Sequence, residues 1–95
     1  MIPFTIQIPT MYGLMLANRH DINQTNALLK TGAAIDHNTI ILLSDVLRLI
    51  KDPVFLDVGS NIGTHSMALR GIAKEVHSFE AQRIIYNMLV GSIAL

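Results

Sequence analysis

The sequence contains no cysteine among its 95 residues. Without thiols the chain cannot form disulfide bonds, thiolate metal sites or a cysteine nucleophile, so all three kinds of chemistry are excluded. The absence also fits a reducing compartment, and we expect a cytoplasmic protein. Because the histidines are scattered and match no ligand spacing, we expect no metal site either.

Charged residues are scarce as well. They make up 15% of the chain, against roughly 25% in an average soluble domain. The seven basic residues balance the seven acidic ones, and no basic stripe is visible. We therefore expect no nucleic-acid partner.

Hydrophobic residues, by contrast, make up 51% of the chain. A small autonomous domain has much surface and should carry more charge than this. The apolar segment 83–95 also has no polar tail. We interpret the chain as the amino-terminal piece of a longer protein, whose other segments cover its apolar faces.

Long hydrophobic runs are missing too. The longest, residues 88–95, is far shorter than the roughly 18–20 apolar residues of a transmembrane helix, so we expect no membrane partner. The amino-terminal segment lacks a basic n-region and is interrupted by Pro3 and Pro9, which argues against a signal peptide.

Residues 1–53 are predicted to form a lead-in of strands and helices. Residues 4–8 alternate apolar and polar, as in a half-buried strand bordered by Pro3 and Pro9. Proline at both ends suits either an edge strand or a short hairpin arm, for which residues 11–17 are the candidate return strand.

Two helices should follow this segment. A capping box formed by Asp21 and Gln24 opens the first helix, which ends near Gly32. Asp36 or Asn38 caps the second. Its apolar face consists of Ile40, Leu43, Leu47 and Ile50.

Residues 54–95 read as strand, helix, strand and helix. The strand 54–58 is apolar except for one acid, as expected of a strand covered on both faces. A second strand is predicted over 76–79 and a nearly buried helix over 83–95. Such a βαβ unit brings the ends of both strands to one edge of the sheet.

The residues that indicate chemistry lie at this edge. Gly59 allows the chain to turn directly off the strand, and Gly63 allows the next helix to pack closely. Glu80 follows Gly59 at about the 20-residue distance expected between a nucleotide-binding loop and an acid that binds a ribose.

The loop differs from a dinucleotide-binding fingerprint. Asn61 stands where that fingerprint has its middle glycine, and Asp57 adds a negative charge two residues before the first glycine. This charge disfavours a pyrophosphate and suits a cationic ligand such as S-adenosylmethionine, which carries a sulfonium and an ammonium. Two alternatives stay open: an NAD-dependent oxidoreductase in which Glu80 binds the ribose, and a non-catalytic truncated module.

Residues 55–66 (FLDVGSNIGTHS) and 76–82 (VHSFEAQ) resemble the first two motifs of the class I S-adenosylmethionine-dependent methyltransferases. Among them the chain is most similar to the FkbM family, which carries a D-x-G-x-N-x-G loop and an F-E-x strand end. The resemblance covers about residues 54–95. It implies an α/β fold of the Rossmann-like three-layer αβα type, incomplete at the carboxyl end, with residues 54–95 as the first βαβα part of its cofactor-binding domain.

The resemblance also implies a set of cofactor-binding residues. Those of the loop and the following helix start are Asp57, Gly59, Ser60, Asn61, Ile62, Gly63 and His65. At the second strand end, Glu80 binds the ribose, and Ala81 and Gln82 border the adenosine. The implied reaction is methyl transfer to a hydroxyl of a small molecule or sugar. Segments that contact this acceptor lie beyond Leu95 in the family, so we nominate no catalytic base, and we interpret His65 as a residue of the helix start.

Overall fold

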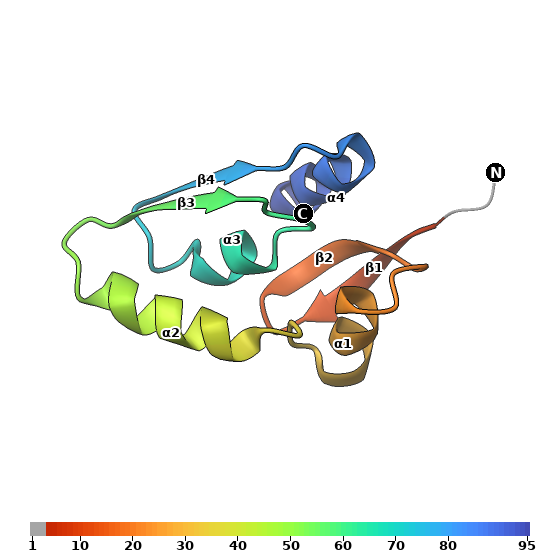
Figure 1. The fold of residues 1–95 in the computed structure, drawn as a ribbon, viewed down its shortest axis with the longest axis horizontal. Helices are drawn as coiled ribbons and strands as arrows, with labels where there is room; N and C mark the ends of the chain where they lie inside the picture. Colours follow the sequence, from red (N-terminus) through yellow and green to blue (C-terminus); the bar gives the residue numbers. More distant parts are fainter. Residues whose placement is uncertain (1–3) are drawn as a thin grey trace.

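The structure, a computed structural model, describes residues 4–95. Pro3, the expected border of the first strand, lies outside this range. The described chain has an α/β fold with principal extents of 47 × 25 × 20 Å. Along the chain (Figure 1) the elements are β1 (Thr5–Thr10), β2 (Gly13–Asn18), α1 (Gln24–Thr31), α2 (His37–Arg48), β3 (Val54–Val58), α3 (Thr64–Leu69), β4 (Glu75–Phe79) and α4 (Arg83–Ala94).

The first two strands form an antiparallel hairpin, one of the two arrangements that the sequence leaves open. β1 is longer than expected, because Pro9 lies inside it and pairs with Leu14 rather than bordering it. A proline has no N–H to donate, and a strand with a free outer edge tolerates that loss.

Helix α1 begins later than the capping box predicts. It starts at Gln24, and its N-cap Asn23 makes no side-chain cap hydrogen bond. Asp21 instead accepts a hydrogen bond from the Asn23 amide at 2.9 Å, which forms a turn before the helix. The glycine stop is confirmed, since Gly32 adopts a left-handed conformation with φ of 74°.

Helix α2 packs against α3 rather than against a sheet. Its predicted apolar face is confirmed at Ile40 and Leu47, which are buried, and Leu43 is half-buried. Ile50 lies beyond the helix end at Arg48 and is exposed. The buried stripe is therefore one turn shorter than predicted.

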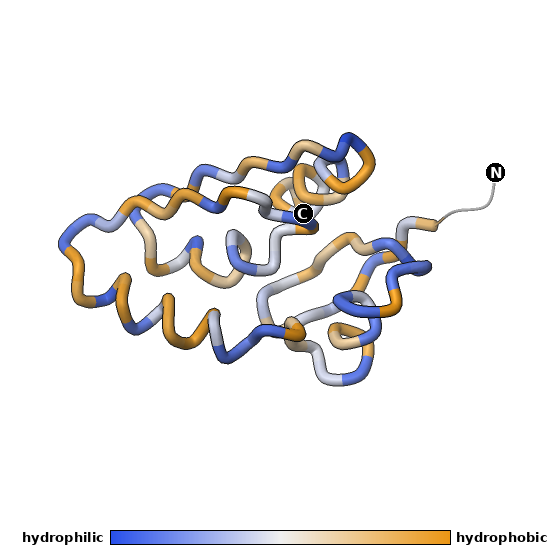
Figure 2. The backbone as a smooth tube through the Cα atoms, viewed as in Figure 1, coloured by the Kyte–Doolittle hydropathy of each residue, from blue (hydrophilic) through white to orange (hydrophobic). Residues whose placement is uncertain are grey.

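Strands β3 and β4 are parallel, and α3 connects them. Val58 pairs with Phe79, so both strands end at the same edge, as predicted. The expectation that this strand is covered on both faces is wrong, because β3 is covered on one face only. α3 packs on that face, while the other face carries the exposed apolar side chains of Val54, Leu56, Val58 and Phe79. Figure 2 shows the apolar residues along the backbone of β3. Residues 4–95 thus contain two small two-stranded sheets and lack a helical layer on this face.

Helix α4 is also less buried than expected. Met88, Leu89 and Ser92 are buried, whereas Ile84, Val90 and other apolar residues of this helix are exposed. The buried side packs on β2, where the hydroxyl of Ser92 accepts a hydrogen bond from the Leu16 amide at 2.9 Å. α4 therefore joins the end of the chain to the lead-in hairpin. No helix within residues 4–95 has the length and hydropathy that crossing a bilayer requires.

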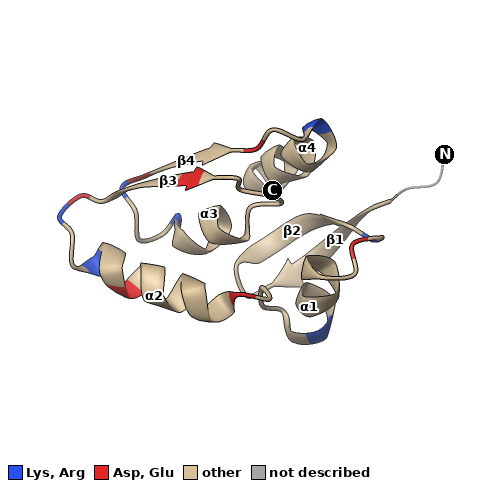
Figure 3. Ribbon diagram, in the orientation of Figure 1, with Lys and Arg blue, Asp and Glu red and all other residues tan. Residues whose placement is uncertain are grey.

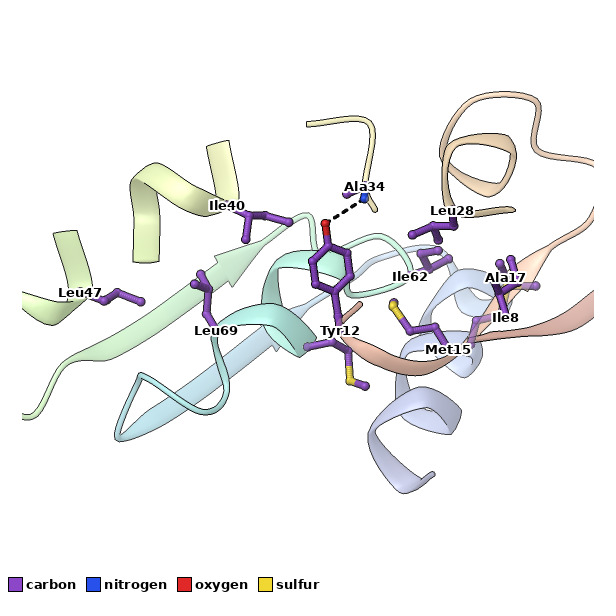
Figure 4. Packing of buried hydrophobic residues seen from close by; sticks show 12 residues of the cluster. Ile8, Tyr12, Met15, Ala17, Leu28, Ala34, Ile40, Leu47, Ile62 and Leu69 are labelled. Atoms are coloured by element: carbon purple, nitrogen blue, oxygen red, sulfur yellow. Dashed lines mark hydrogen bonds between the residues drawn. The ribbon is translucent and has the colours of Figure 1, made fainter. Parts of the chain in front are cut away.

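One apolar core connects the lead-in with residues 54–95. Its buried members come from the hairpin, α1, α2, the loop after β3, α3 and α4. Figure 4 shows Tyr12 in this core, with its hydroxyl directed at Ala34. This hydroxyl accepts a hydrogen bond from the Ala34 amide at 2.8 Å and pairs with Nδ1 of His37 at 2.7 Å.

Replacing Tyr12 by phenylalanine should destabilise the protein. The Ala34 amide is buried and would lose its acceptor, so we expect Tyr12→Phe to lower the free energy of unfolding by about 1–3 kcal/mol at neutral pH. Urea denaturation followed by circular dichroism measures this difference. Equal stability of the two proteins would show that water replaces the hydroxyl.

The same variant should change the alkaline stability profile. Burial raises the pKa of Tyr12 above its ordinary value of 10.0; the Ala34 hydrogen bond lowers it, and the charge of Asp36 raises it further. The folded state therefore holds the phenolic proton more tightly than the unfolded state. This contribution is fully present below pH 10.0 and is lost as pH rises through the folded-state pKa. We expect the stability gap between wild type and Tyr12→Phe to narrow at alkaline pH.

Candidate functional site

The loop after β3 alternates between ordinary and left-handed backbone. Gly59, Asn61 and Gly63 have φ values of 75°, 55° and 97°. Glycine reaches this region without steric cost, and asparagine is among the side chains that tolerate it best. Asn61 therefore fits the position where a dinucleotide-binding loop has a glycine. The predicted turn at Gly59 is confirmed.

Ser60 ties the ends of the two parallel strands together. Its amide and that of Gly59 both donate to the carbonyl of Phe79, at 2.9 and 2.8 Å. The Ser60 hydroxyl donates to the Asp57 carbonyl at 2.6 Å and accepts from the Phe79 amide at 3.1 Å. With both roles of this hydroxyl in use, Ser60 fixes the shape of the loop.

Asp57 is a buried acid with few partners. Its side chain lies at the end of β3, and the residue is only 7% exposed. Oδ2 accepts a hydrogen bond from the hydroxyl of Ser66 at 2.6 Å, and Ser66 also lies 2.6 Å from the hydroxyl of Ser78. Within residues 4–95 no cation pairs with Asp57, and its Oδ1 has no hydrogen bond. A buried carboxylate without a cation is costly unless a ligand completes its environment.

Glu80 closes the loop from the end of β4. Its Oε1 accepts a hydrogen bond from the Asn61 amide at 2.8 Å, and its Oε2 accepts one from the Gln82 amide at 2.9 Å. The spacing between Gly59 and Glu80 suggests an acid that binds a ribose. It does not indicate that Glu80 also accepts hydrogen bonds from the backbone of the loop. Because a carboxylate offers about four acceptor positions, Glu80 can hold the loop and still accept hydrogen bonds from a ligand.

Two residues of the lead-in reach the same loop. Asp36, expected to cap α2, makes no cap hydrogen bond; its Oδ2 lies 2.7 Å from Nε2 of His65. Gln24 accepts from the Ile35 amide at 2.8 Å and donates to the Thr64 hydroxyl at 3.4 Å. No sequence pattern signals the contacts with Thr64 and His65, because they join residues 40 and 29 positions apart in the chain.

Two hollows meet at Gly59. The smaller, of about 110 Å³, is lined by Gln24, Asp36, Asp57, Gly59, Ser60, Asn61, Thr64 and His65. The larger, of about 720 Å³, is lined by Val58, Gly59, Ser78, Phe79, Glu80, Ala81, Gln82 and Tyr86. A Cβ atom on Gly59 would meet nothing within 4 Å, so the space beside this turn is open. A separate groove of about 330 Å³, which α2 lines in part, contains none of the predicted site residues.

Two predicted cofactor-binding residues line neither hollow. Ile62 belongs to the core, and Gly63 packs under Leu89 of α4. They support the loop from inside. The other predicted residues are brought together: Asp57, Ser60, Asn61 and His65 at the smaller hollow, Glu80, Ala81 and Gln82 at the larger, and Gly59 at both.

The charges around the loop are mainly acidic. Figure 3 shows acidic residues at the end of β3, just after β4 and just before α2. Neither hollow is lined by a lysine or an arginine. Residues 4–95 contain no group of three histidine, aspartate or glutamate side chains arranged to hold a metal ion.

Comparison with known proteins gives no similar protein: no family model matches the chain, and no curated protein or solved structure does.

Proposed function

We propose that the chain binds S-adenosylmethionine and serves as the donor-binding part of a methyltransferase. The observation that carries this proposal is the meeting of two chemically different hollows at Gly59, each with one acid of the predicted pair. Asp57 lines the smaller hollow and Glu80 the larger one. An elongated ligand with a cationic end and a nucleoside end matches this arrangement.

The larger hollow suits the nucleoside. Its volume of about 720 Å³ lies within the range of roughly 300–1,000 Å³ that small-molecule sites occupy. Phe79 and Tyr86 offer aromatic surface for a base, and Glu80 has acceptor capacity for ribose hydroxyls. The smaller hollow is too confined for a nucleoside. Its acids suit a positively charged amino-acid end.

The fold proposed for this function is the Rossmann-like three-layer type of the class I methyltransferases, with the FkbM family as the group it resembles. The parallel pair β3 and β4, joined by α3, supports it. In such a fold a further helical layer would cover the exposed apolar face at Val54, Leu56, Val58 and Phe79.

The chemistry that the bound donor supplies is an electrophilic methyl group, and we propose a hydroxyl of a small molecule or sugar as its acceptor. The residues described above contribute by positioning. The loop fixes the donor's direction through Asp57 and Glu80, and Ser60 keeps the loop rigid. Holding two reactants in the correct geometry accounts for much of the rate enhancement of such a reaction.

Calorimetric titration of the protein with S-adenosylhomocysteine and, separately, with NADH tests the proposal. NADH would place a pyrophosphate beside Asp57, where a second negative charge is unfavourable, although Glu80 could still bind its ribose. We expect saturable heat with S-adenosylhomocysteine and none with NADH. Heat with NADH alone would replace the proposal by an oxidoreductase, and no heat with either would favour a non-catalytic module.

A further inference from the structure

The groove of about 330 Å³ that α2 lines in part, the α2 groove, is not used by the proposed function. α2 forms one side of it. The other side consists of Met11 and Tyr12 from the turn of the hairpin and of Ala68, Leu69 and Ile72 from α3 and the residues after it. The volume lies at the lower end of the roughly 300–1,000 Å³ that small-molecule sites occupy. The α2 groove therefore suits a small ligand rather than a second copy of the cofactor.

Most of the lining of the α2 groove is apolar. Ile40 and Ile41 of α2 add aliphatic surface to that of the opposite side. Tyr12 and His37 also line the groove, but the hydroxyl of Tyr12 and Nδ1 of His37 are paired with each other at 2.7 Å. The other polar side chains of the lining are Ser44, Asp45 and Arg48. An apolar surface with a few polar groups on one side suits a ligand with an apolar body and one polar end.

Asp45 and Arg48 are the charged residues of this lining. They lie three residues apart on α2, a spacing at which an acid and a base can form an ion pair. Within residues 4–95, however, neither side chain forms an ion pair or a hydrogen bond. The α2 groove thus offers a carboxylate and a guanidinium on neighbouring turns of one helix, and no residue in this part of the chain neutralises either charge.

We propose that the α2 groove binds a free apolar α-amino acid, for which L-leucine serves as the probe. The ligand's carboxylate accepts hydrogen bonds from the guanidinium of Arg48, and its ammonium donates to the carboxylate of Asp45. Its side chain lies on the aliphatic surface of the groove. This inference goes beyond the proposed function and does not depend on it, since the α2 groove shares no residue with the two hollows at Gly59.

A free amino acid fits because it carries both opposite charges on one carbon atom. A ligand with a single charge, such as one end of a peptide, would leave either Asp45 or Arg48 without a partner and would place a like charge beside it. Both side chains are exposed to solvent. Each charged contact should therefore change the affinity by only about fivefold, and we expect binding in the millimolar range.

Titration followed by the backbone amide signals in NMR spectra tests the site with four ligands. Besides L-leucine these are L-leucinamide, which lacks the carboxylate, N-acetyl-L-leucine, which lacks the ammonium, and glycine, which lacks the apolar side chain. We expect saturable shifts of the amides of α2 and of residues 69–72 with L-leucine, and at least about fivefold weaker binding of each analogue. Binding of either leucine derivative as tight as that of L-leucine would overturn the proposal, as would the absence of these shifts with L-leucine.

Two variants test the charged contacts separately. Arg48→Gln should weaken L-leucine about fivefold and leave L-leucinamide unchanged, whereas Asp45→Asn should weaken L-leucine equally and leave N-acetyl-L-leucine unchanged. Lys51→Gln is the matched control, because Lys51 is an exposed cation three residues after Arg48 that does not line the groove. This control should bind L-leucine as the wild type does. If Arg48→Gln and Asp45→Asn also bind it as the wild type does, recognition of the two charges is wrong. None of these outcomes changes the titration with S-adenosylhomocysteine, which tests the proposed function.

Discussion

Gly63→Ala is expected to lower the free energy of unfolding by about 2–5 kcal/mol. Gly63 has a φ of 97°, a conformation that strains a residue with a Cβ atom by about 1–3 kcal/mol. A Cβ atom there would also overlap Cδ1 of Leu89, which is buried and 1% exposed. Overpacking of this kind costs typically 1–3 kcal/mol. Since small domains have about 5–15 kcal/mol of stability in all, the variant should be close to unfolding.

Alanine variants of three other glycines separate the two causes, which are backbone strain and overlap with a neighbouring side chain. Gly71 has neither a positive φ nor a close neighbour, and Gly59 has a φ of 75° with open space around it. Gly91 is helical, and its Cβ atom would meet Cδ1 of Leu16, which is only half-buried and can move. We expect the loss to be near zero for Gly71→Ala, about 1 kcal/mol for Gly59→Ala and for Gly91→Ala, and largest for Gly63→Ala.

Urea denaturation of the four variants measures these differences. Equal losses for Gly63→Ala and Gly59→Ala would show that Leu89 moves aside at no cost. The loop would then be supported less tightly by α4 than its packing indicates.

The order of elements in residues 54–95 could be predicted because each has a clear local pattern. The strand β3 was predicted with its observed bounds, since an apolar run between Pro53 and Gly59 leaves little freedom. Burial could not be predicted as well. An apolar sequence indicates that a face is suited to burial, but it does not show whether another segment packs on that face. For this reason β3 and α4 expose residues that were expected to be buried.

The candidate site, like the fold, could be predicted only in its local features. The turn at Gly59 and the opposition of Asp57 and Glu80 follow from local backbone preference and from the parallel pairing of two strands. The contribution of the lead-in could not be predicted. Asp36 precedes a helix, where an acid usually caps the first amides, and only the packing of α2 against α3 brings it to His65 instead.

The largest expected effect on ligand binding is that of Asp57→Asn. Asparagine has nearly the same shape and can still accept the hydrogen bond that Ser66 donates at 2.6 Å. The charge is lost, and with it the attraction for a cationic ligand end. We expect the affinity for S-adenosylhomocysteine to fall about 10- to 100-fold, the usual effect of removing a charge-assisted hydrogen bond from a buried site.

The stability of the same variant should move in the opposite direction. The carboxylate is 7% exposed and has no cation beside it within residues 4–95, so removing the charge relieves a desolvation cost. We expect the free energy of unfolding of Asp57→Asn to stay equal or to rise by about 1 kcal/mol. Asp45→Asn, a change at an exposed position of α2, serves as the control and should alter neither quantity. If Asp57 only anchors the loop, its replacement will lower stability and leave affinity per folded molecule unchanged. A fall in affinity without a fall in stability therefore identifies an acid that is present for its ligand rather than for the fold.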